Sequence, residues 1–214
     1  MNRIVIFFIA VGLNVMGIAQ EESVNKAKSA FTGGVRAGFT ASQISGDDLS
    51  GFNKFGGYAG LFANFPVVPS AKIKLQFELN FIMKGSHTYV SPGSTAFINN
   101  YALNLFYVEA PLLLKLAPFT NKLRGLEIEI GPAFNVLFHY IEKIDGEKRN
   151  IDEKFRWYEV ALDIGIGYLF KEHYGINLRW STSIIPVRKP EWRRDFLRKY
   201  QYNDLLAFSL FYQF

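Results

Sequence analysis

The segment KIKLQFELNFIMK, residues 72–84, alternates apolar and polar side chains along almost its whole length. Side chains two residues apart lie on one face of a β-strand, whereas a helix would spread the charges of this segment around its circumference. The apolar face holds Ile73, Leu75, Phe77, Leu79, Phe81 and Met83, and the polar face holds Lys72, Lys74, Gln76, Glu78, Asn80 and Lys84. Apart from Ile82, the segment fits a strand with one apolar and one polar face.

Seven further segments show related alternation, which gives eight predicted strands in all. These segments are residues 34–42, 57–65, 102–116, 126–140, 155–170, 174–184 and 203–214. The connections after the first, third, fifth and seventh strands are long and polar, and the three between them are short. This sorting is typical of an outer-membrane barrel whose termini lie on the short-turn, periplasmic side. The predicted fold is therefore all-β, an eight-stranded antiparallel up-and-down transmembrane β-barrel.

The composition is compatible with such a barrel. The chain has 214 residues, a net charge of +5 and an aromatic content of 16%. Its mean hydropathy of +0.05 does not exclude a membrane protein, because apolar and polar residues alternate along barrel strands and average out. The chain has no cysteine, which excludes a disulfide framework, a thiolate metal site and a cysteine nucleophile.

The N-terminal residues have the layout of a secretory signal peptide. Arg3 precedes an apolar run, and the small residues Gly17 and Ala19 follow it. An uncleaved anchor helix is the alternative, but the run is shorter than the roughly 20 residues that a spanning helix needs. We expect residues 1–19 to be a signal peptide, residues 20–32 a short periplasmic segment and residues 33–214 the barrel domain.

If the apolar faces of the strands meet lipid, their polar faces point into the barrel. The predicted interior polar network consists of Arg36, Lys74, Glu78, Glu109, Lys115, Glu127, Glu129, Glu159, Asp163 and Arg179. Six acids in the dry core of a soluble β-sandwich would be prohibitive, whereas inside a barrel they can pair with the cations and with trapped water. Eight strands enclose an interior about wide enough for their own side chains, which argues against a general diffusion pore.

The chain ends with LLAFSLFYQF, residues 205–214, in which one strand face is apolar throughout. That face holds Leu206, Phe208, Leu210, Tyr212 and Phe214. The pattern suits a lipid-facing strand that closes a barrel, and it resembles the C-terminal signal that the bacterial β-barrel assembly machinery recognises on its clients. A core strand of a soluble protein is the alternative.

Several motifs resemble the porin-like outer-membrane β-barrel family of Bacteroidetes, often called the PorT family. They are GVRAGFTASQISGDD, FELNFIMKGS, YVEAPLLLKL, GLEIEIGPAFNVL and FSLFYQF. The residues that stand at the places of the family pattern are Glu78, Lys84, Gly85, Glu109, Pro111, Lys115, Gly131 and Pro132. Phe77 and Ala110 depart from it, where the family often has Pro and Ile. The resemblance implies an outer-membrane barrel, and the founding member's link to protein secretion does not carry over.

Catalytic chemistry has little support. The three histidines, His87, His139 and His173, are predicted in outer loops or in a short turn. Ser86 and His87 are adjacent and would point to opposite faces of a strand, so they do not form a nucleophile and base pair. No metal cluster, phosphate loop or nucleotide fingerprint occurs in the sequence, and no cofactor is expected.

The last long connection, residues 186–200, carries a basic and aromatic cluster. It contains Arg188, Lys189, Trp192, Arg193, Arg194, Arg198 and Lys199. Such a cluster at the height of the outer leaflet suits contact with lipopolysaccharide phosphates, and nucleic acid is not expected as a partner of an exported barrel. A solvated loop that pairs with the acids of the preceding long loop is the alternative.

These observations predict an outer-membrane β-barrel with a structural, adhesion or ligand-binding role through its extracellular loops. A small solute channel and an accessory factor of a protein export system are the alternatives. An outer-membrane lipid-modifying enzyme and a soluble lipocalin-like binder rank below them.

Overall fold

The computed structural model describes residues 31–46, 51–68, 72–89, 100–117, 123–148, 155–170, 172–188 and 200–214. The predicted signal peptide, residues 1–19, lies outside these ranges, as does most of the predicted periplasmic segment. In the described part of the chain, no helix is long and apolar enough to cross a membrane.

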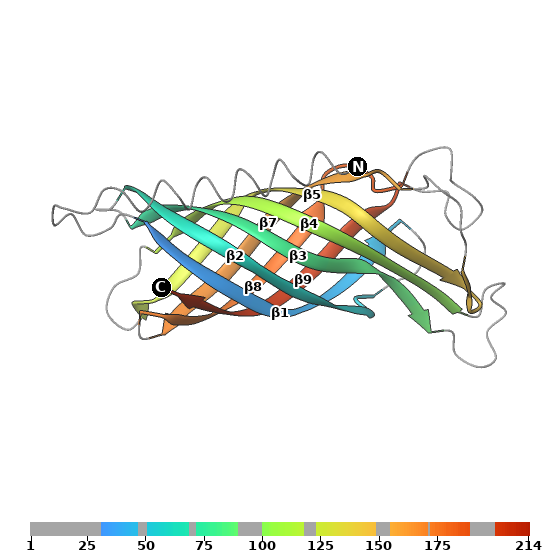
Figure 1. The fold of residues 1–214 in the computed structure, drawn as a ribbon, viewed down its shortest axis with the longest axis horizontal. Coiled ribbons are helices and arrows are strands. Elements are labelled where there is room, and N and C mark those ends of the chain that lie inside the picture. The colour runs from blue at the N-terminus through green and yellow to red at the C-terminus, as the bar shows by residue number, and fades with distance from the viewer. Residues whose placement is uncertain are drawn as a thin grey trace. The chain divides into compact units, whose positions relative to one another are not determined.

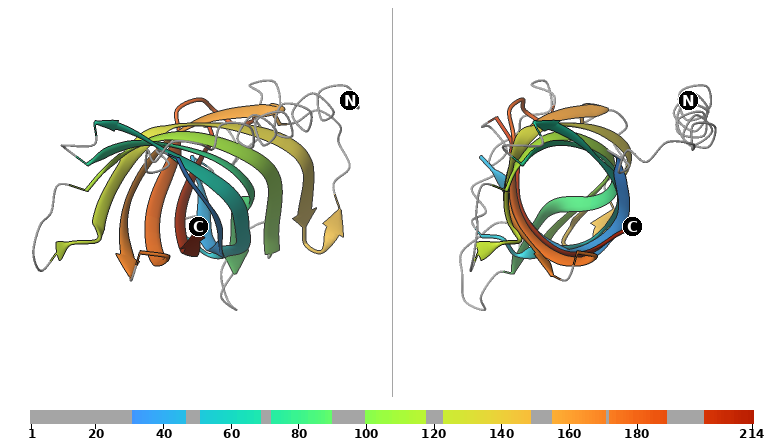
Figure 2. Two further views of the ribbon diagram at one scale, coloured as in Figure 1. Left: turned by 60° about the vertical axis from the view of Figure 1, so that its left-hand side comes forward. Right: turned by 90° about the vertical axis from the view of Figure 1, so that its left-hand side faces the viewer.

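Eight long strands form one closed antiparallel sheet, which confirms the predicted barrel (Figures 1 and 2). The strands are β1 (Thr32–Ser45), β2 (Lys54–Val68), β3 (Ile73–Tyr89), β4 (Asn100–Leu116), β5 (Leu126–Ile144), β7 (Tyr158–Phe170), β8 (Tyr174–Ser183) and β9 (Tyr202–Gln213), and β6 (Glu147–Lys148) is a two-residue addition to β5. Each long strand pairs with its neighbours along the chain, and β1 pairs with β9 to close the ring. The connections after β1, β3 and β8, and the one between β5 and β7, belong to one end of the barrel, the loop end, and those after β2, β4 and β7 belong to the other, the short-turn end.

Several strand boundaries differ from the prediction, and the largest differences are at the ends of β3 and β5. β3 and β5 continue to Tyr89 and Ile144, past the predicted ends at residues 84 and 140. Near those predicted ends the period-two pattern is interrupted, by a positive φ of 143° at Gly85 in β3 and by a register shift opposite β5 between Phe106 and Tyr107. Conversely, Phe155 precedes β7 and forms an isolated bridge with Arg188.

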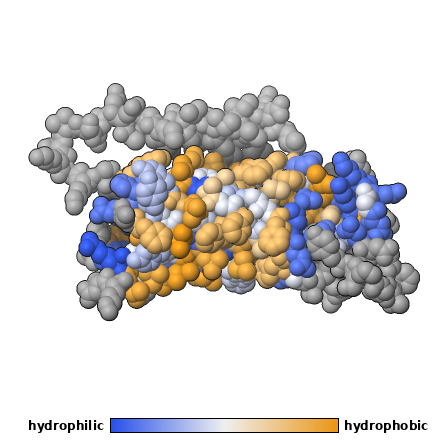
Figure 3. Space-filling view, turned by 90° about the horizontal axis from the view of Figure 1, so that it is seen from below, coloured by the Kyte–Doolittle hydropathy of each residue, from blue (hydrophilic) through white to orange (hydrophobic). Residues whose placement is uncertain are grey.

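The outer wall carries a belt of apolar side chains over the middle of the strands (Figure 3). On β3 the exposed residues are Phe77, Leu79 and Phe81, as the alternation predicts. Leu206 and Leu210 of β9 are likewise exposed, at 37% and 60%. Large apolar side chains that face outward over a continuous belt suit lipid rather than water.

The polarity of the two faces inverts at the loop end of the barrel. There the interior holds an apolar cluster that includes Ile44, Ile82, Leu103, Leu105 and Leu205. On the outer face of β4 and β5 at this end lie Asn104, His139 and Lys143. A barrel that has left the membrane meets water on its outside, so its apolar side chains are stabilised inside, as in a soluble protein.

The loop-side part of β3 closes over the barrel mouth. Pairing of β2 with β3 ends at Tyr58 and Ile82, although both strands continue. Beyond that point the Thr40 hydroxyl donates to the carbonyl of Met83 at 2.8 Å, and Ser42 donates to Gly85 at 3.1 Å. Because these hydroxyls belong to the inner face of β1, β3 passes across the far end of the ring, as the end-on view in Figure 2 shows.

We expect Leu79→Arg to destabilise the folded barrel by about 2 to 4 kcal/mol, because it places a charge near the middle of the lipid-facing belt. Leu123→Arg is the control, since Leu123 is also exposed but lies in the connection before β5. Urea titration in lipid vesicles, read as the fraction of fast-migrating unboiled protein, measures the difference. Equal losses from both variants would contradict a lipid-facing belt.

Candidate functional site: the charged interior

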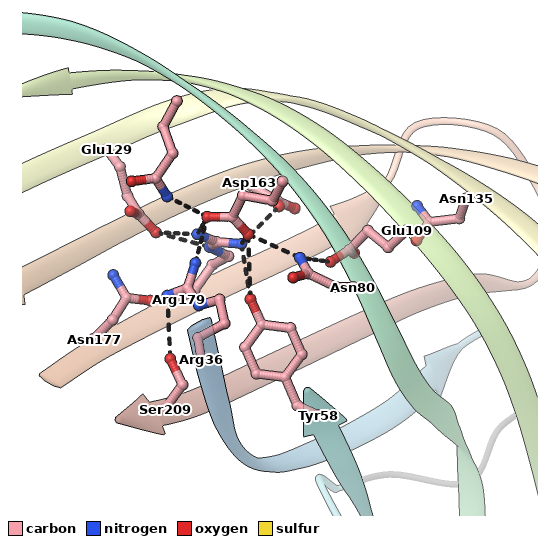
Figure 4. Close-up of polar contacts among 12 residues, drawn as sticks. Arg36, Tyr58, Asn80, Glu109, Glu129, Asn135, Asp163, Asn177, Arg179 and Ser209 are labelled. Carbon is pink, nitrogen blue, oxygen red and sulfur yellow. Dashed lines mark hydrogen bonds and ion pairs between the residues drawn. The ribbon is translucent and has the colours of Figure 1, made fainter. Parts of the chain in front are cut away.

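Glu78 of β3 lies at the centre of the interior network and is fully buried. Figure 4 shows its partners Arg36, Arg179 and Asn80 close together in the interior. Its carboxylate accepts hydrogen bonds from Arg179 Nη1 at 2.9 Å and from Arg179 Nη2 at 2.8 Å. Arg36 Nη1 and Gln76 Nε2 also donate to it, as does Asn80 Nδ2 at 2.8 Å. With the Tyr58 hydroxyl, which donates at 3.4 Å, six donor contacts offset much of the desolvation that burial of this charge costs.

Arg179 of β8 contacts acids on three other strands, β3, β5 and β7. Besides Glu78, its Nε donates to Glu129 Oε1 at 2.7 Å, and Asp163 Oδ2 lies 3.7 Å from its Nη1. Gly165 is its cross-strand neighbour, and a Cβ at that position would lie 2.6 Å from Glu129 Oε1. The absence of a side chain at Gly165 therefore makes room for this ion pair.

At the short-turn end, aromatic rings and an ion pair fill the interior. Lys115 Nζ lies 2.6 Å from Glu127 Oε2 and 5.6 Å from the centre of the Phe211 ring. Phe211 packs edge-on against Phe62, with the ring centres 5.9 Å apart. Gly175 is paired with Phe211, and a Cβ there would lie 2.1 Å from that ring. Aromatic side chains thus occupy the lumen at this level.

Towards the loop end a second lysine links two acids. Lys84 Nζ lies 2.7 Å from Glu159 Oε1 and 3.7 Å from Glu109 Oε1. It also donates to Asn135 Oδ1 at 3.3 Å, and the Tyr107 ring centre lies 5.3 Å away. Lys84 was not in the predicted network, although its place on the polar face of β3 indicated an inward direction.

The structure corrects one residue of the predicted surface cluster. Arg188 is buried at 4% exposure, with its Nη2 2.8 Å from Glu142 Oε1 and its Nε 2.7 Å from Gln201 Oε1. Its guanidinium also lies 4.5 Å from the centre of the Phe155 ring. Arg188 therefore joins two loops to the barrel mouth instead of contributing to an exposed basic surface. Lys189, Trp192, Arg193, Arg194, Arg198 and Lys199 lie outside the described residues.

All ten residues of the predicted interior network are on the inner face of the barrel. Nine are buried and Lys74 is partly exposed near the rim, where its Nζ lies 3.2 Å from Glu127 Oε1. Tyr58 and Glu142 are further interior residues that the sequence did not indicate, and Asn80, like Lys84, was predicted on the inward polar face of β3 but not in the network. Directly after β9, Phe214 is 68% exposed and its N–H donates to the carbonyl of Gly33 in β1 at 2.9 Å. Its role in assembly stays a prediction.

The described residues contain no arrangement for catalysis that we can identify. His139 and His173 are exposed, and His173 lies in a turn at the opposite end from His139. Ser86 is buried and the adjacent His87 is not, which agrees with their placement on opposite faces of β3. Within the described ranges, no group of three or more His, Cys, Asp or Glu side chains is placed to hold a metal ion.

The closed sheet, the apolar belt and the charged, filled interior define a β-barrel membrane protein. Residues 18–188 match the family model described as outer membrane protein beta-barrel domain, and the chain belongs to that family. This membership supports localisation in the outer membrane. None of the curated proteins compared is significantly similar to the chain.

Solved structures of similar architecture include small barrels of three bacteria. Neisserial surface protein A has 12% identity, covers 87% of this chain and 98% of its own, and gives a TM-score of 0.48. The attachment invasion locus protein Ail of Yersinia pestis is 9% identical, and the match covers 86% of this chain and 98% of Ail with a TM-score of 0.49. OprG of Pseudomonas aeruginosa is 12% identical, and the match covers 86% of this chain and 96% of OprG with a TM-score of 0.39.

We expect Arg179→Met to destabilise the barrel by about 3 to 5 kcal/mol, because it leaves Glu78 and Glu129 buried without their main cation. Lys74→Met is the matched control, since Lys74 is partly exposed and Glu127 keeps Lys115 as a partner. We expect Lys74→Met to lower the free energy of unfolding by about 1 kcal/mol or less. Urea-induced unfolding in vesicles, followed by tryptophan fluorescence, compares the two. A loss below 1 kcal/mol for Arg179→Met would show that the central cluster is not needed for stability.

Proposed function

We propose that the protein is a recognition barrel of the outer membrane, which binds an envelope or extracellular partner through its loop end and has no catalytic or pore function. The observation that carries the proposal is the filled interior. Phe62, Phe211 and Lys115 occupy it at the short-turn end, and the apolar cluster around Leu103 and Leu105 occupies it at the loop end. A function that needs passage through the barrel has no support from this arrangement.

The length of the strands supports a role at the loop end. A membrane-spanning β-strand needs about 9 to 11 residues, whereas β3 and β4 have 17 each and β5 has 19. On the loop side of β4, Leu103 and Leu105 face inward and Asn104 faces outward, as expected of a segment in water. These strands therefore form a rigid platform that holds the long connections away from the lipid surface.

We expect the purified protein to give no stable conductance steps in planar lipid bilayers under conditions in which a trimeric porin conducts. Phe211→Ala alone should not open a path, because the loop-end cluster stays in place. Leu105→Asp combined with Phe211→Ala is the positive control, since it disrupts both filled regions. Regular unit conductance from the wild type would overturn the proposal in favour of the solute channel.

The fourth long loop is the part for which we propose a ligand. Its basic and aromatic residues suit the phosphates and acyl boundary of lipopolysaccharide. Arg188 anchors the start of this loop through Glu142, and Gln201 anchors its end through Arg188 and through its carbonyl, which accepts from Val187 at 2.8 Å. The two anchors reduce the entropy that the loop loses on binding.

Replacement of Lys189, Arg193, Arg194, Arg198 and Lys199 by Gln should lower the affinity for lipopolysaccharide at least tenfold and flatten its salt dependence. The control replaces the two exposed lysines Lys143 and Lys148, which lie on the neighbouring hairpin, by Gln. Binding of labelled lipopolysaccharide to the barrel in nanodiscs measures both. If the two variants lose affinity equally, the fourth loop is not the specific site.

The resemblance to the PorT family supports a finer placement within the outer-membrane barrels, and we include it in the proposal. A role as an accessory factor in protein export follows from no observation on the described residues. We therefore rank recognition above it. The assembly machinery is the proposed partner during biogenesis, supported by the exposed apolar stripe of β9 and its terminal Phe214.

A further inference from the structure

The pairing of β2 with β3 stops before either strand ends, and this leaves part of β2 with a free edge. Tyr58 and Ile82 are the last partners on the loop side, although both strands continue. On its other edge, β2 stays paired with β1 as far as Lys54 opposite Ser42. Within the described ranges, residues 54–57 therefore have one paired edge and one edge without a neighbouring strand.

β3 does not run beside this edge, because it crosses the inner face of β2. A Cβ at Gly56 would lie 2.7 Å from the carbonyl oxygen of Met83, so β3 passes directly over Gly56. The same Met83 carbonyl accepts from Thr40, and the carbonyl of Gly85 accepts from Ser42, both on the inner face of β1. Bonds to β1 side chains thus replace the bonds that β3 would make with β2 in a continuous sheet. The free edge of β2 is left on the outer side.

The direction of the backbone groups follows from the alternation along β2. In a strand, the N–H and C=O groups of alternate residues point to the same edge. The carbonyl of Lys54 accepts from the Ser42 hydroxyl of β1, so Lys54 and Gly56 direct their backbone groups to β1. Phe55 and Gly57 then direct theirs to the free edge. The Phe55 carbonyl accepts from Lys54 Nζ at 2.5 Å, whereas the Phe55 N–H and both groups of Gly57 have no bonded partner in the described part of the chain.

Apolar surface surrounds this edge on the outer face of the barrel. Phe55 is 69% exposed and lies opposite Ala41, beyond which the outer face of β1 is polar. Gly57 lies opposite Phe39, which is 57% exposed, and the nearest atom to a Cβ at Gly57 would be 3.8 Å away. An apolar side chain placed beside Gly57 would therefore contact both rings. The edge lies at the loop-side margin of the apolar belt, where unpaired backbone groups are costly.

Lys54 gives the edge a positive charge. Its side chain is partly buried, its ammonium donates to a backbone carbonyl, and no carboxylate of the described residues forms an ion pair with it. A lysine on an edge deters strand pairing in general. A partner that brings a carboxylate to this place would exchange a neutral acceptor for a charged one, which forms the stronger hydrogen bond. Lys54 therefore favours an acidic partner over others.

We propose that the edge Lys54–Gly57 of β2 is a strand-addition site for an extended, acidic segment of another protein. The segment pairs its backbone with Phe55 and Gly57, packs an apolar side chain against Phe55 and Phe39, and places a carboxylate on Lys54. This inference rests on the proposed recognition function and names a class of partner for it. The site is separate from the fourth long loop, for which lipopolysaccharide is the proposed ligand.

The test measures binding of a labelled, capped eight-residue peptide of alternating valine and glutamate to the full-length barrel in nanodiscs, by fluorescence anisotropy. Phe55 and Gly57 face outward, and residues directly opposite each other in an antiparallel pair share a face, so the valines should make the backbone bonds. N-methylation of the two central valines should lower the affinity at least tenfold. N-methylation of the two central glutamates is the matched control and should change the affinity by less than about threefold, because their N–H groups face away from the barrel.

Two substitutions test the edge from the side of the barrel. Gly57→Pro removes an N–H that faces the edge and should lower the affinity about fivefold or more, whereas Gly57→Ala retains the N–H and should stay within about twofold of the wild type. Lys54→Gln should lower the affinity about threefold or more, and Lys148→Gln, on the exposed β6, should not. A fast-migrating unboiled band establishes that each variant is folded.

Equal losses from the two methylated peptides would overturn the proposal. Tighter binding by Lys54→Gln would overturn it too, because Lys54 would then only protect the edge. So would slow hydrogen exchange of the Gly57 amide in the barrel alone, since the edge would already be paired within the chain or with a second copy. The lipopolysaccharide assay uses residues of the fourth loop, so a failure of the recognition function is measured separately from a failure of this site.

Discussion

The pairing of β1 with β9 is the constraint on which the rest of the structure depends. In lipid, each unpaired backbone N–H or C=O costs several kcal/mol, so a sheet can span a membrane only when it has no free edge. The register runs from Gly34 opposite Gln213 to Ser45 opposite Tyr202, over almost the full length of both strands. Closure at eight strands then fixes a narrow interior, and the small radius determines which side chains can fit inside.

The narrow interior explains the combination of glycine with large charged side chains. Arg179 and Glu129 both have Gly165 as a cross-strand neighbour, and Arg36 has Gly60. The volume beside Gly165 is occupied by the side chain of Glu129, and the volume beside Gly60 is occupied by Asn80, its partner on β3. Buried charges gain little net stability as pairs, so their value here lies in filling the lumen with groups that fit only in one register. A shift of one residue would move these charges to the lipid face.

Alternation predicted the fold and the direction of the network residues because lipid and interior impose opposite preferences on adjacent positions. The partners within the network could not be predicted, since Glu78 and Arg179 are 101 positions apart and meet only when the sheet closes. The burial of Arg188 was also missed, because it stands at the start of a strongly basic stretch of sequence and its partner Glu142 lies on the distant strand β5. Leu103 and Leu105 were missed as interior residues for a further reason. Outside the membrane, apolar residues of β4 prefer the inner face and polar residues the outer face, the reverse of the preference within the lipid. The sequence does not indicate at which residue β4 leaves the lipid.

The change of face polarity at the loop end relates the architecture to the proposed recognition function. The membrane-spanning half is filled by paired charges and aromatic rings, and the loop-side half is filled by an apolar core over which β3 closes. Because charged and aromatic groups fill the lumen at one level and apolar groups fill it at the other, the barrel is rigid at both levels. Arg188 extends this rigidity to the loops, because its contacts with Glu142, Gln201 and Phe155 tie two loops to the same mouth. A barrel built in this way holds its loops in place, which is what a surface that recognises a partner requires and what a transport path does not.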